Sequence, residues 1–491
     1  MIDAASFHPE LHSRKVTTFE DLMAYPFGKY GSAFVLLNMF IMAYGAMVAY
    51  LLIIKDTVPT ILGLAHGMKG GIEREIVLVI TSLTIMVPLS MQKDMASLAF
   101  TSFLSVTADI ILVFFVMIFS PIKESVQQIG GVGQLIKQDS IEPTLFIGLG
   151  ILSTAMACQH SAFIVYGSIE NGTRRRWARV TNNSIGLAAI LCVILGVTGY
   201  IGFLDETQGD VLNNFEAGSV AANGARSLLA ITMFFTYPME AFVGRHVLIS
   251  LFYKGDYSKV KSITLGLYVL TLIPALIFDD LGPVLSITGA LGGSCISYIA
   301  PGFVVLGVNG EAFLKHCEEM LADYRRRKTN KSMTNHSDVV GDIELPVAGN
   351  SKRVMSDGSG GIHNNNDDDT ELDLPVEGNK IIMTTSPSGP KPIWWYLLGY
   401  PLWCWIATKG SEGMKRKLSA PDIYDGTTDT NQTAENQALS SNMNMNDELA
   451  DAVVVPTKGE FRMAIFFISF GILAAVAGLS SNIWVQINGF D

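Results

Sequence analysis

Long apolar runs separated by polar segments dominate the chain. A helix needs roughly 20 consecutive apolar residues to cross the hydrocarbon core of a bilayer. Runs of about this length occupy nine stretches, at 31–54, 75–91, 97–120, 143–168, 180–203, 226–252, 261–281, 283–308 and 462–486. The second run is the shortest of them. The pattern predicts an all-α integral membrane protein with about nine transmembrane helices.

The polar segments divide this membrane protein into four parts. We expect residues 1–30 to form a cytoplasmic N-terminal segment and residues 31–308 to form a transmembrane core of eight helices. Residues 309–461 are polar, and we expect a cytoplasmic and mostly disordered insert there. Residues 462–486 supply the last transmembrane helix.

The insert has features of its own. From about 317 to 460 it is rich in Asn, Asp, Ser and Gly, a composition typical of disorder. Two short stretches repeat within it, at 345–350 and 374–379, through chance or as a duplicated docking peptide. Its segment 392–408 carries four of the six tryptophans of the chain. Because tryptophan favours the headgroup layer, we predict an interfacial segment there.

Loop charges predict the orientation, since lysine and arginine concentrate on the cytoplasmic side. Basic residues follow the fourth, sixth and eighth runs: Arg174, Arg175, Arg176, Arg179, Lys254, Lys259, Lys261, Arg325, Arg326, Arg327 and Lys328. The loop at 204–225, on the opposite side, is acidic. The N-terminus is then cytoplasmic, and nine spans place the C-terminus outside.

Two features belong to this cytoplasmic face. Thr17 and Glu20 have the spacing of a capping box, which favours either a short surface helix at about 18–25 or a plain polar lead-in. Arg245 and His246 lie near the cytoplasmic end of the sixth run. We expect their long side chains to snorkel to the membrane surface.

Composition excludes several classes of protein. The chain has 34 basic and 45 acidic residues and a net charge of −11, which argues against nucleic acid as a partner. Five cysteines in 491 residues do not make a disulfide scaffold. Motifs of metalloproteases, P-loop enzymes and α/β-hydrolases are missing from the sequence, so we expect no enzyme.

The sixth run carries the densest intramembrane polar pattern. Thr232, Thr236 and Glu240 are four residues apart and therefore share one helix face. Pro238 removes a backbone hydrogen bond between them and frees carbonyl oxygen near Thr236. Hydroxyl and carbonyl oxygens suit an alkali cation. Alternatively, the threonines bond back to their own helix.

The fourth run is interrupted by the polar stretch Cys158-Gln159-His160-Ser161. A helix can unwind there, and discontinuous helices near the midplane form transporter binding sites. His160 taken alone is equally compatible with a packing residue. The eighth run has a glycine-rich stretch at 288–293, which is either another weak point or a close helix contact. Asp109 in the third run is a proton or cation relay, or a structural carboxylate.

Several of these stretches resemble one family of transporters. They are Gly45–Pro59, Pro88–Ser90, Cys158–Tyr166, Thr236–Arg245 and the outer-loop residues Gly209, Asp210, Asn213, Asn214 and Phe215. In order and in sequence they are similar to the sodium-coupled neutral amino acid transporters, solute carrier family 38 of the amino acid/auxin permease group. The resemblance covers about residues 17–308.

The resemblance implies a LeuT-like inverted-repeat fold, with five plus five helices and an eleventh. It implies a neutral amino acid bound midway and a sodium ion as coupling ion, with no other cofactor. The implied sodium ligand is Thr236, and the implied substrate-binding residues are Cys158, Gln159, His160, Ser161, Thr232 and Tyr237. Because the first run corresponds to the family's third helix, we also expect an N-terminally incomplete fold that lacks the first two helices.

The leading hypothesis is therefore a secondary active transporter of neutral amino acids that works by alternating access. One alternative is a non-transporting amino acid sensor or scaffold, with a cytoplasmic partner for the 317–460 insert; another is an inactive, N-terminally truncated product. The expected partners are the amino acid and the lipid bilayer. The expected location is the plasma membrane or an endolysosomal or vacuolar membrane.

Overall fold

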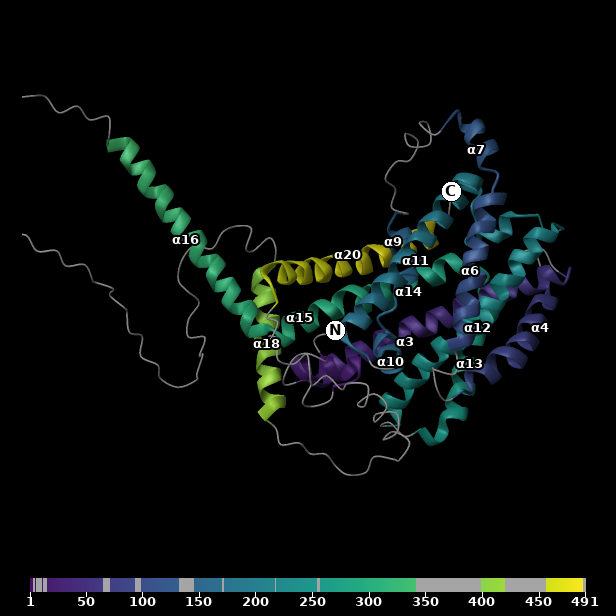
Figure 1. Ribbon diagram of the computed structural model, residues 1–491, viewed down its shortest axis with the longest axis horizontal. Helices are drawn as coiled ribbons and strands as arrows, with labels where there is room; N and C mark the ends of the chain where they lie inside the picture. The colour runs from purple at the N-terminus through teal and green to yellow at the C-terminus, as the bar shows by residue number, and fades with distance from the viewer. Residues whose placement is uncertain are drawn as a thin grey trace, which may run out of the picture. The chain divides into compact units, whose positions relative to one another are not determined.

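The computed structural model describes these residues: 1–2, 5, 11, 16–64, 71–92, 99–131, 145–169, 172–216, 218–253, 257–340, 399–419 and 456–488. Their regular structure is helical without a strand, which confirms the predicted all-α class. The chain divides into two compact units. The first comprises Met1–Leu314 and Leu402–Asp491, and the second comprises Lys315–Pro401. The first unit contains the helix bundle and the candidate site (Figure 1).

Seven helical stretches in the described part of the chain are long and apolar enough to cross a membrane. They are built from α3 (Phe19–Ile61), α6 (Ala99–Phe119), α11 (Arg174–Phe203), α12 (Val220–Phe252), α13 (Val260–Ile277), the α14 to α15 stretch (Leu281–Val308) and α20 (Lys458–Asn488). Large apolar side chains on their outer faces are exposed, for example Phe100, Ile190 and Phe466. Such an apolar outer surface fits lipid and not water.

The other two predicted spans consist of shorter helical pieces. The run 75–91 folds as α4 (Ile72–Thr81), the π-helix η1 (Ser82–Met86) and α5 (Val87–Ser90). The run 143–168 is divided into α9 (Leu145–Ala155) and α10 (Ala162–Gly167). The break predicted at 158–161 is therefore present, and it begins at Met156.

The α14 to α15 stretch is α14 (Leu281–Thr288), η6 (Gly289–Gly293), η7 (Cys295–Ile299) and α15 (Ala300–Val308), with η6 and η7 of π type. Its glycines are sites of close helix packing. A Cβ on Gly292 would lie 2.9 Å from the Met42 nitrogen of α3, and a Cβ on Gly289 would overlap the Gly150 carbonyl of α9. Gly45 of α3 likewise leaves room for the Thr288 side chain. The stretch 288–293 thus combines a π-helical irregularity with close helix packing, so both interpretations of it apply.

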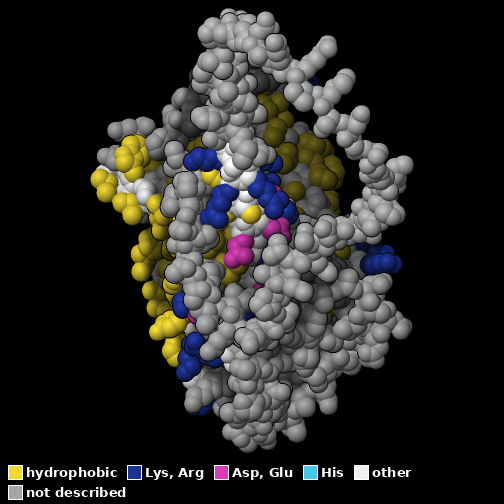
Figure 2. Space-filling view, turned by 90° about the vertical axis from the view of Figure 1, so that its left-hand side faces the viewer, with side chains coloured by type: hydrophobic (Ala, Val, Ile, Leu, Met, Phe, Trp, Pro, Cys, Tyr) yellow, Lys and Arg dark blue, Asp and Glu magenta, His cyan; other side chains and the backbone are white. Residues whose placement is uncertain are grey.

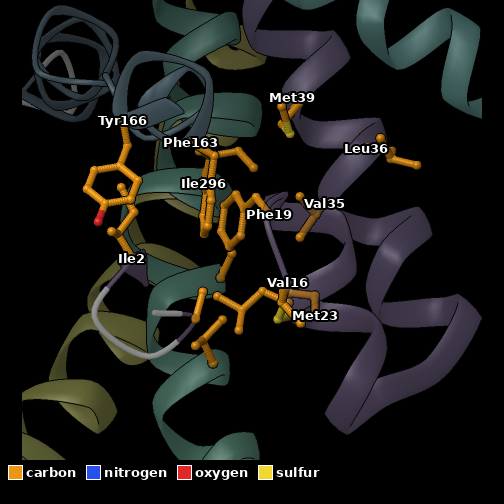
Figure 3. Packing of buried hydrophobic residues seen from close by; sticks show 14 of the residues in the cluster. Ile2, Val16, Phe19, Met23, Val35, Leu36, Met39, Phe163, Tyr166 and Ile296 are labelled. Atoms are coloured by element: carbon orange, nitrogen blue, oxygen red, sulfur yellow. The ribbon is translucent and has the colours of Figure 1, made fainter. Parts of the chain in front are cut away.

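The beginning of α3 is a separate helical piece. Thr18, and not the predicted Thr17, caps the helix by accepting a hydrogen bond from the Asp21 N–H at 3.2 Å. Gly28 then interrupts the helix with a φ of 63°, a conformation that L residues rarely adopt. Phe19 stacks on Phe163 of α10 with ring centroids 6.0 Å apart, next to Ile296 (Figure 3). The first turns of α3 are thus packed against the helix that follows the break.

Short helices complete the description of the connections. They are α7 (Ile122–Ile129), η3 (Leu204–Glu206), η4 (Val211–Asn214) and η5 (Tyr257–Lys259).

Disorder was predicted from about residue 317, but α16 runs from Gly310 to Val340, so that prediction is wrong for 317–340. Residues 317–340 thus belong to α16, which begins two residues after the end of the eighth run. The repeats at 345–350 and 374–379 lie outside the described residues.

The described part of the predicted interfacial segment is the beginning of α18 (Tyr400–Ser419). In Figure 1, α18 runs across the direction of α15 and α20. Trp403 and Ala407 are buried, whereas Leu402 and Trp405 are exposed. Gly410 lies against Gly307 at the end of α15. Figure 2 shows the side that lies on the left in Figure 1, and lysine and arginine side chains are visible there among the described residues.

Candidate functional site

The break between α9 and α10 is held in place by its own polar residues. The Gln159 side-chain oxygen accepts hydrogen bonds from the Cys158 N–H at 2.9 Å and from the Ser297 hydroxyl of η7 at 2.9 Å. The Ser161 hydroxyl donates to the Cys158 carbonyl at 3.3 Å. Gln159 therefore anchors the unwound backbone to the π-helical stretch of the eighth run, and the Cys158 side chain is a free thiol.

His160 connects the same break to α12. Its Nε2 lies 3.2 Å and 3.0 Å from the two carboxyl oxygens of Glu240. The His160 side chain is 3% exposed and that of Glu240 is 15% exposed. The other ring nitrogen, Nδ1, is buried and has no hydrogen-bond partner among the described residues. A pair of this kind at membrane depth is expensive and indicates a functional role.

A second carboxylate lies near this pair. Asp109 of α6 is hydrogen-bonded to the Thr232 hydroxyl of α12. That hydroxyl is also 3.4 Å from the Ser105 carbonyl. Tyr50 of α3 interacts electrostatically with both Glu240 and Asp109. The Tyr50 phenol is therefore within electrostatic range of two carboxyl groups, one on α6 and one on α12.

The two remaining candidate residues on α12 make other contacts. The Thr236 hydroxyl donates to the Thr232 carbonyl at 2.8 Å, which is the back-bonding alternative considered above. The Tyr237 hydroxyl lies 3.0 Å from the Thr271 hydroxyl of α13, and Tyr237 is buried. Tyr237 is thus bound to α13 and has no described contact with the break.

Glu240 connects α12 with the break between α9 and α10. The sequence did not identify Glu240 as a substrate-binding or sodium-binding candidate. The spacing of Thr232, Thr236 and Glu240 had placed Glu240 on the polar face of α12. Nothing in the local sequence connects it with His160, which is 80 residues away. A carboxylate inside an apolar run was the available signal, because such a residue requires a partner.

The snorkelling prediction is wrong for Arg245. The residue is 3% exposed, and its guanidinium donates to the carbonyl oxygens of Ser90 at 3.0 Å and Gln92 at 3.1 Å. It therefore satisfies backbone carbonyls at the end of α5, which a helix C-terminus leaves unpaired. The Nε2 of His246 lies 2.9 Å from a carboxyl oxygen of Glu20, and this contact fixes the first turn of α3 to α12.

A further ionic cluster lies near the end of α3 that is opposite to Glu20, where α3 meets α4 and α13. Lys55 donates to the Ala275 and Phe278 carbonyls at the end of α13 at 3.2 Å and 3.1 Å, and its Nζ is 2.8 Å from Asp279. Arg74 of α4 pairs with Asp56 of α3. The cluster joins α3, α4 and α13 on the side where positive loop charges are scarce, and the sequence pattern did not predict it.

Comparison with known proteins decides the family. The family described as "Transmembrane amino acid transporter protein" matches residues 1–319, a range that includes every element of the candidate site. The chain belongs to this family. Membership confirms the resemblance found in the residues, and it agrees with the apolar helices of the bundle. This member of the transmembrane amino acid transporter family is a multi-pass membrane protein.

Several relatives of this family member are named for transport. "Putative sodium-coupled neutral amino acid transporter 11" of Rattus norvegicus is 29% identical over 311 residues, which cover 62% of this chain and 67% of the relative. "Vacuolar amino acid transporter 2" of Saccharomyces cerevisiae is 28% identical over 306 residues, which cover 59% of this chain and 63% of the relative. "Sodium-coupled neutral amino acid transporter 7" of Mus musculus is 25% identical over 297 residues, with 56% and 62% covered. The aligned part of the chain thus spans between 62% and 67% of the length of these relatives.

Proposed function

We propose that the protein moves neutral amino acids across a plasma or vacuolar membrane by alternating access. The observation that carries this proposal is the broken helix at Met156–Ser161, tied to α12 by the buried pair of His160 and Glu240. Unwound backbone offers N–H and C=O groups that a zwitterion needs, and such breaks line binding sites in transporters. The names of the relatives support an amino acid as substrate.

Coupling to sodium through Thr236 is the second part of the proposal. The Thr236 hydroxyl donates its hydrogen to Thr232, which leaves the oxygen lone pairs available to a cation. Pro238 lies two residues further along α12 and cannot donate a backbone hydrogen bond. Oxygen ligands of this kind suit a hard monovalent cation, and two relatives are named as sodium-coupled.

The test is uptake of radiolabelled L-alanine, L-glutamine and L-leucine into proteoliposomes with an imposed sodium gradient. We expect sodium-dependent uptake by the wild type. Thr236→Ala removes one oxygen ligand and should weaken the sodium dependence about 10-fold or more, while Thr236→Ser should retain it.

Thr198→Ala is the matched control. Thr198 makes the same bond to its own helix, from its hydroxyl to the Ile194 carbonyl at 2.7 Å, but it lies on α11. Its substitution should leave uptake unchanged. Unchanged sodium dependence in Thr236→Ala would contradict the sodium ligand, and wild-type protein that takes up none of the three amino acids would contradict the proposed function.

A further inference from the structure

The contact between His160 and Glu240 places a hydrogen on Nε2 of the ring. Both oxygens of the Glu240 carboxylate are within hydrogen-bond distance of Nε2. An ionised carboxylate can only accept, so Nε2 must be the donor. When the imidazole is neutral, its lone pair is therefore on Nδ1. That nitrogen is buried without a partner in the described part of the chain.

Buried acceptors without a partner are rare and call for an explanation. The Nδ1 of His160 lies in the unwound segment between α9 and α10, where the proposed function places the substrate. The groups an amino acid offers there are an ammonium donor and a carboxylate acceptor. Of these, only the ammonium can donate a hydrogen bond to a lone pair.

Charge points to the same group. Among the described residues, Glu240 forms its ion pair with His160 and has none with a lysine or arginine. Glu240 acts electrostatically on the Tyr50 phenol of α3, and Asp109 of α6 acts on the same phenol. With a neutral imidazole, this part of the membrane interior holds negative charge that no described cation balances. A positively charged ligand group supplies the balance.

We propose that Glu240 is a positioning residue that fixes the His160 tautomer, so that Nδ1 accepts a hydrogen bond from the α-ammonium group of the substrate. The proposal rests on the proposed function and deepens it, because it names the substrate group that His160 recognises. The imidazole then lies between the ammonium and the Glu240 carboxylate and connects the two charges.

A consequence for pH dependence follows from the same arrangement. Protonation of Nδ1 turns the acceptor into a donor and gives the ring a positive charge that repels the ammonium. Binding of the amino acid should therefore weaken as the pH is lowered through the titration of His160. A histidine that only holds α10 against α12 would have no such effect on affinity.

The experiment measures binding of L-alanine, L-glutamine and L-leucine to the full-length protein in lipid nanodiscs. His160→Asn keeps an amide oxygen near the position of Nδ1 and loses the contact of Nε2 with Glu240. His160→Gln keeps an amide donor near the position of Nε2 and loses the acceptor at Nδ1. We expect Kd to rise at least about 10-fold in His160→Gln and clearly less in His160→Asn.

The pH profile is the second readout. Between pH 7.5 and pH 5.5, the Kd of the wild type should rise, and that of His160→Asn should stay constant. The reverse order of the two variants, or a flat wild-type profile, would overturn the proposal while leaving the proposed function intact. Wild-type protein that binds none of the three amino acids would instead refute the proposed function, and the proposal with it.

Modified ligands make the test independent of variant folding. N-methyl-L-alanine retains N–H donors, whereas N,N,N-trimethyl-L-alanine keeps the positive charge and has none. We expect the wild type to bind the first and to lose affinity for the second by about 10-fold or more. Equal affinity for the two ligands would show that Nδ1 accepts no hydrogen bond from the substrate.

Discussion

At the scale of single residues, Asp210 shows how burial changes the pKa of a carboxyl group in the loop that connects α11 and α12. Its Oδ1 accepts the Leu212 N–H at 3.0 Å, while Oδ2 is buried and has no partner among the described residues. Burial raises the pKa of the Asp210 carboxyl above its ordinary value of 3.8, although the Leu212 N–H and the Arg226 guanidinium act in the opposite direction. The folded protein thus holds this proton more tightly than the unfolded chain.

The sign of the resulting pH dependence follows directly. The protonated carboxyl favours the folded state, so this contribution to stability is present below pH 3.8 and is lost as the pH rises through the raised pKa. Asp210→Asn keeps the acceptor for Leu212 and cannot titrate. We expect its melting temperature to exceed that of the wild type at pH 7 by about 1–3 °C, with the difference shrinking towards pH 4.

Thermal unfolding in detergent at several pH values checks the Asp210 prediction. Asp205→Asn, an exposed substitution in the same connection, is the control and should give a constant difference. A difference that grows on acidification would refute the assignment.

Residue contacts were also where sequence reasoning was weakest. The polar face of α12 was visible in the spacing of Thr232 and Glu240, but their partners, Asp109 and His160, come from other helices. Arg245 was predicted to snorkel because only its place along the helix was known, whereas its carbonyl partners lie at the end of a different run. Periodicity identifies faces of helices, and tertiary packing alone decides what each face meets.

At the scale of elements, the sequence predicted positions of helices better than their ends. The break in the fourth run was visible because polar residues interrupt apolar ones, and α9 and α10 indeed end and begin on either side of it. The prediction of disorder was wrong at the beginning of the insert, since the polar helix α16 follows the eighth run and ends at Val340. Composition describes an average over a segment and does not show how far a neighbouring helix continues.

The docking of α18 rests on glycine contacts that can be tested. A Cβ on Gly410 would overlap the Gly307 Cα of α15, and one on Gly413 would overlap the Pro26 carbonyl of α3. Glycine to alanine usually stabilises an exposed helix position by about 1 kcal/mol. Here overpacking costs about 1–3 kcal/mol. Gly410→Ala with Gly413→Ala should therefore lower the melting temperature and expose α18 to protease.

Gly186→Ala in α11 is the matched control for that double substitution. No atom lies within 4 Å of a Cβ at Gly186, so alanine should be neutral or stabilising there. A double variant of α18 that melts at or above the wild-type temperature would show that α18 does not pack on α3 and α15 in the membrane.

At the scale of the whole molecule, the alternation of helices and loops predicts which ends face the cytoplasm. The connection between α11 and α12 carries Asp205 and Glu206, while the one between α12 and α13 carries Lys259, and Lys261 follows in the first turn of α13. Consecutive spans place these two connections on opposite sides, and the positive-inside rule makes the second one cytoplasmic. The pair of His160 and Glu240 would then lie between the two aqueous phases.

Cysteine labelling tests this orientation with two exposed positions, Gln208 and Lys261. In a background whose five native cysteines are replaced, Lys261→Cys should resist an impermeant maleimide on intact cells and react once digitonin opens the plasma membrane. Gln208→Cys should react on intact cells if the protein is in the plasma membrane, and only in full detergent if it is in a vacuolar membrane. Labelling of Lys261→Cys on intact cells would show that the orientation is opposite to the predicted one, because the reagent cannot reach a residue beside a cytoplasmic loop from outside.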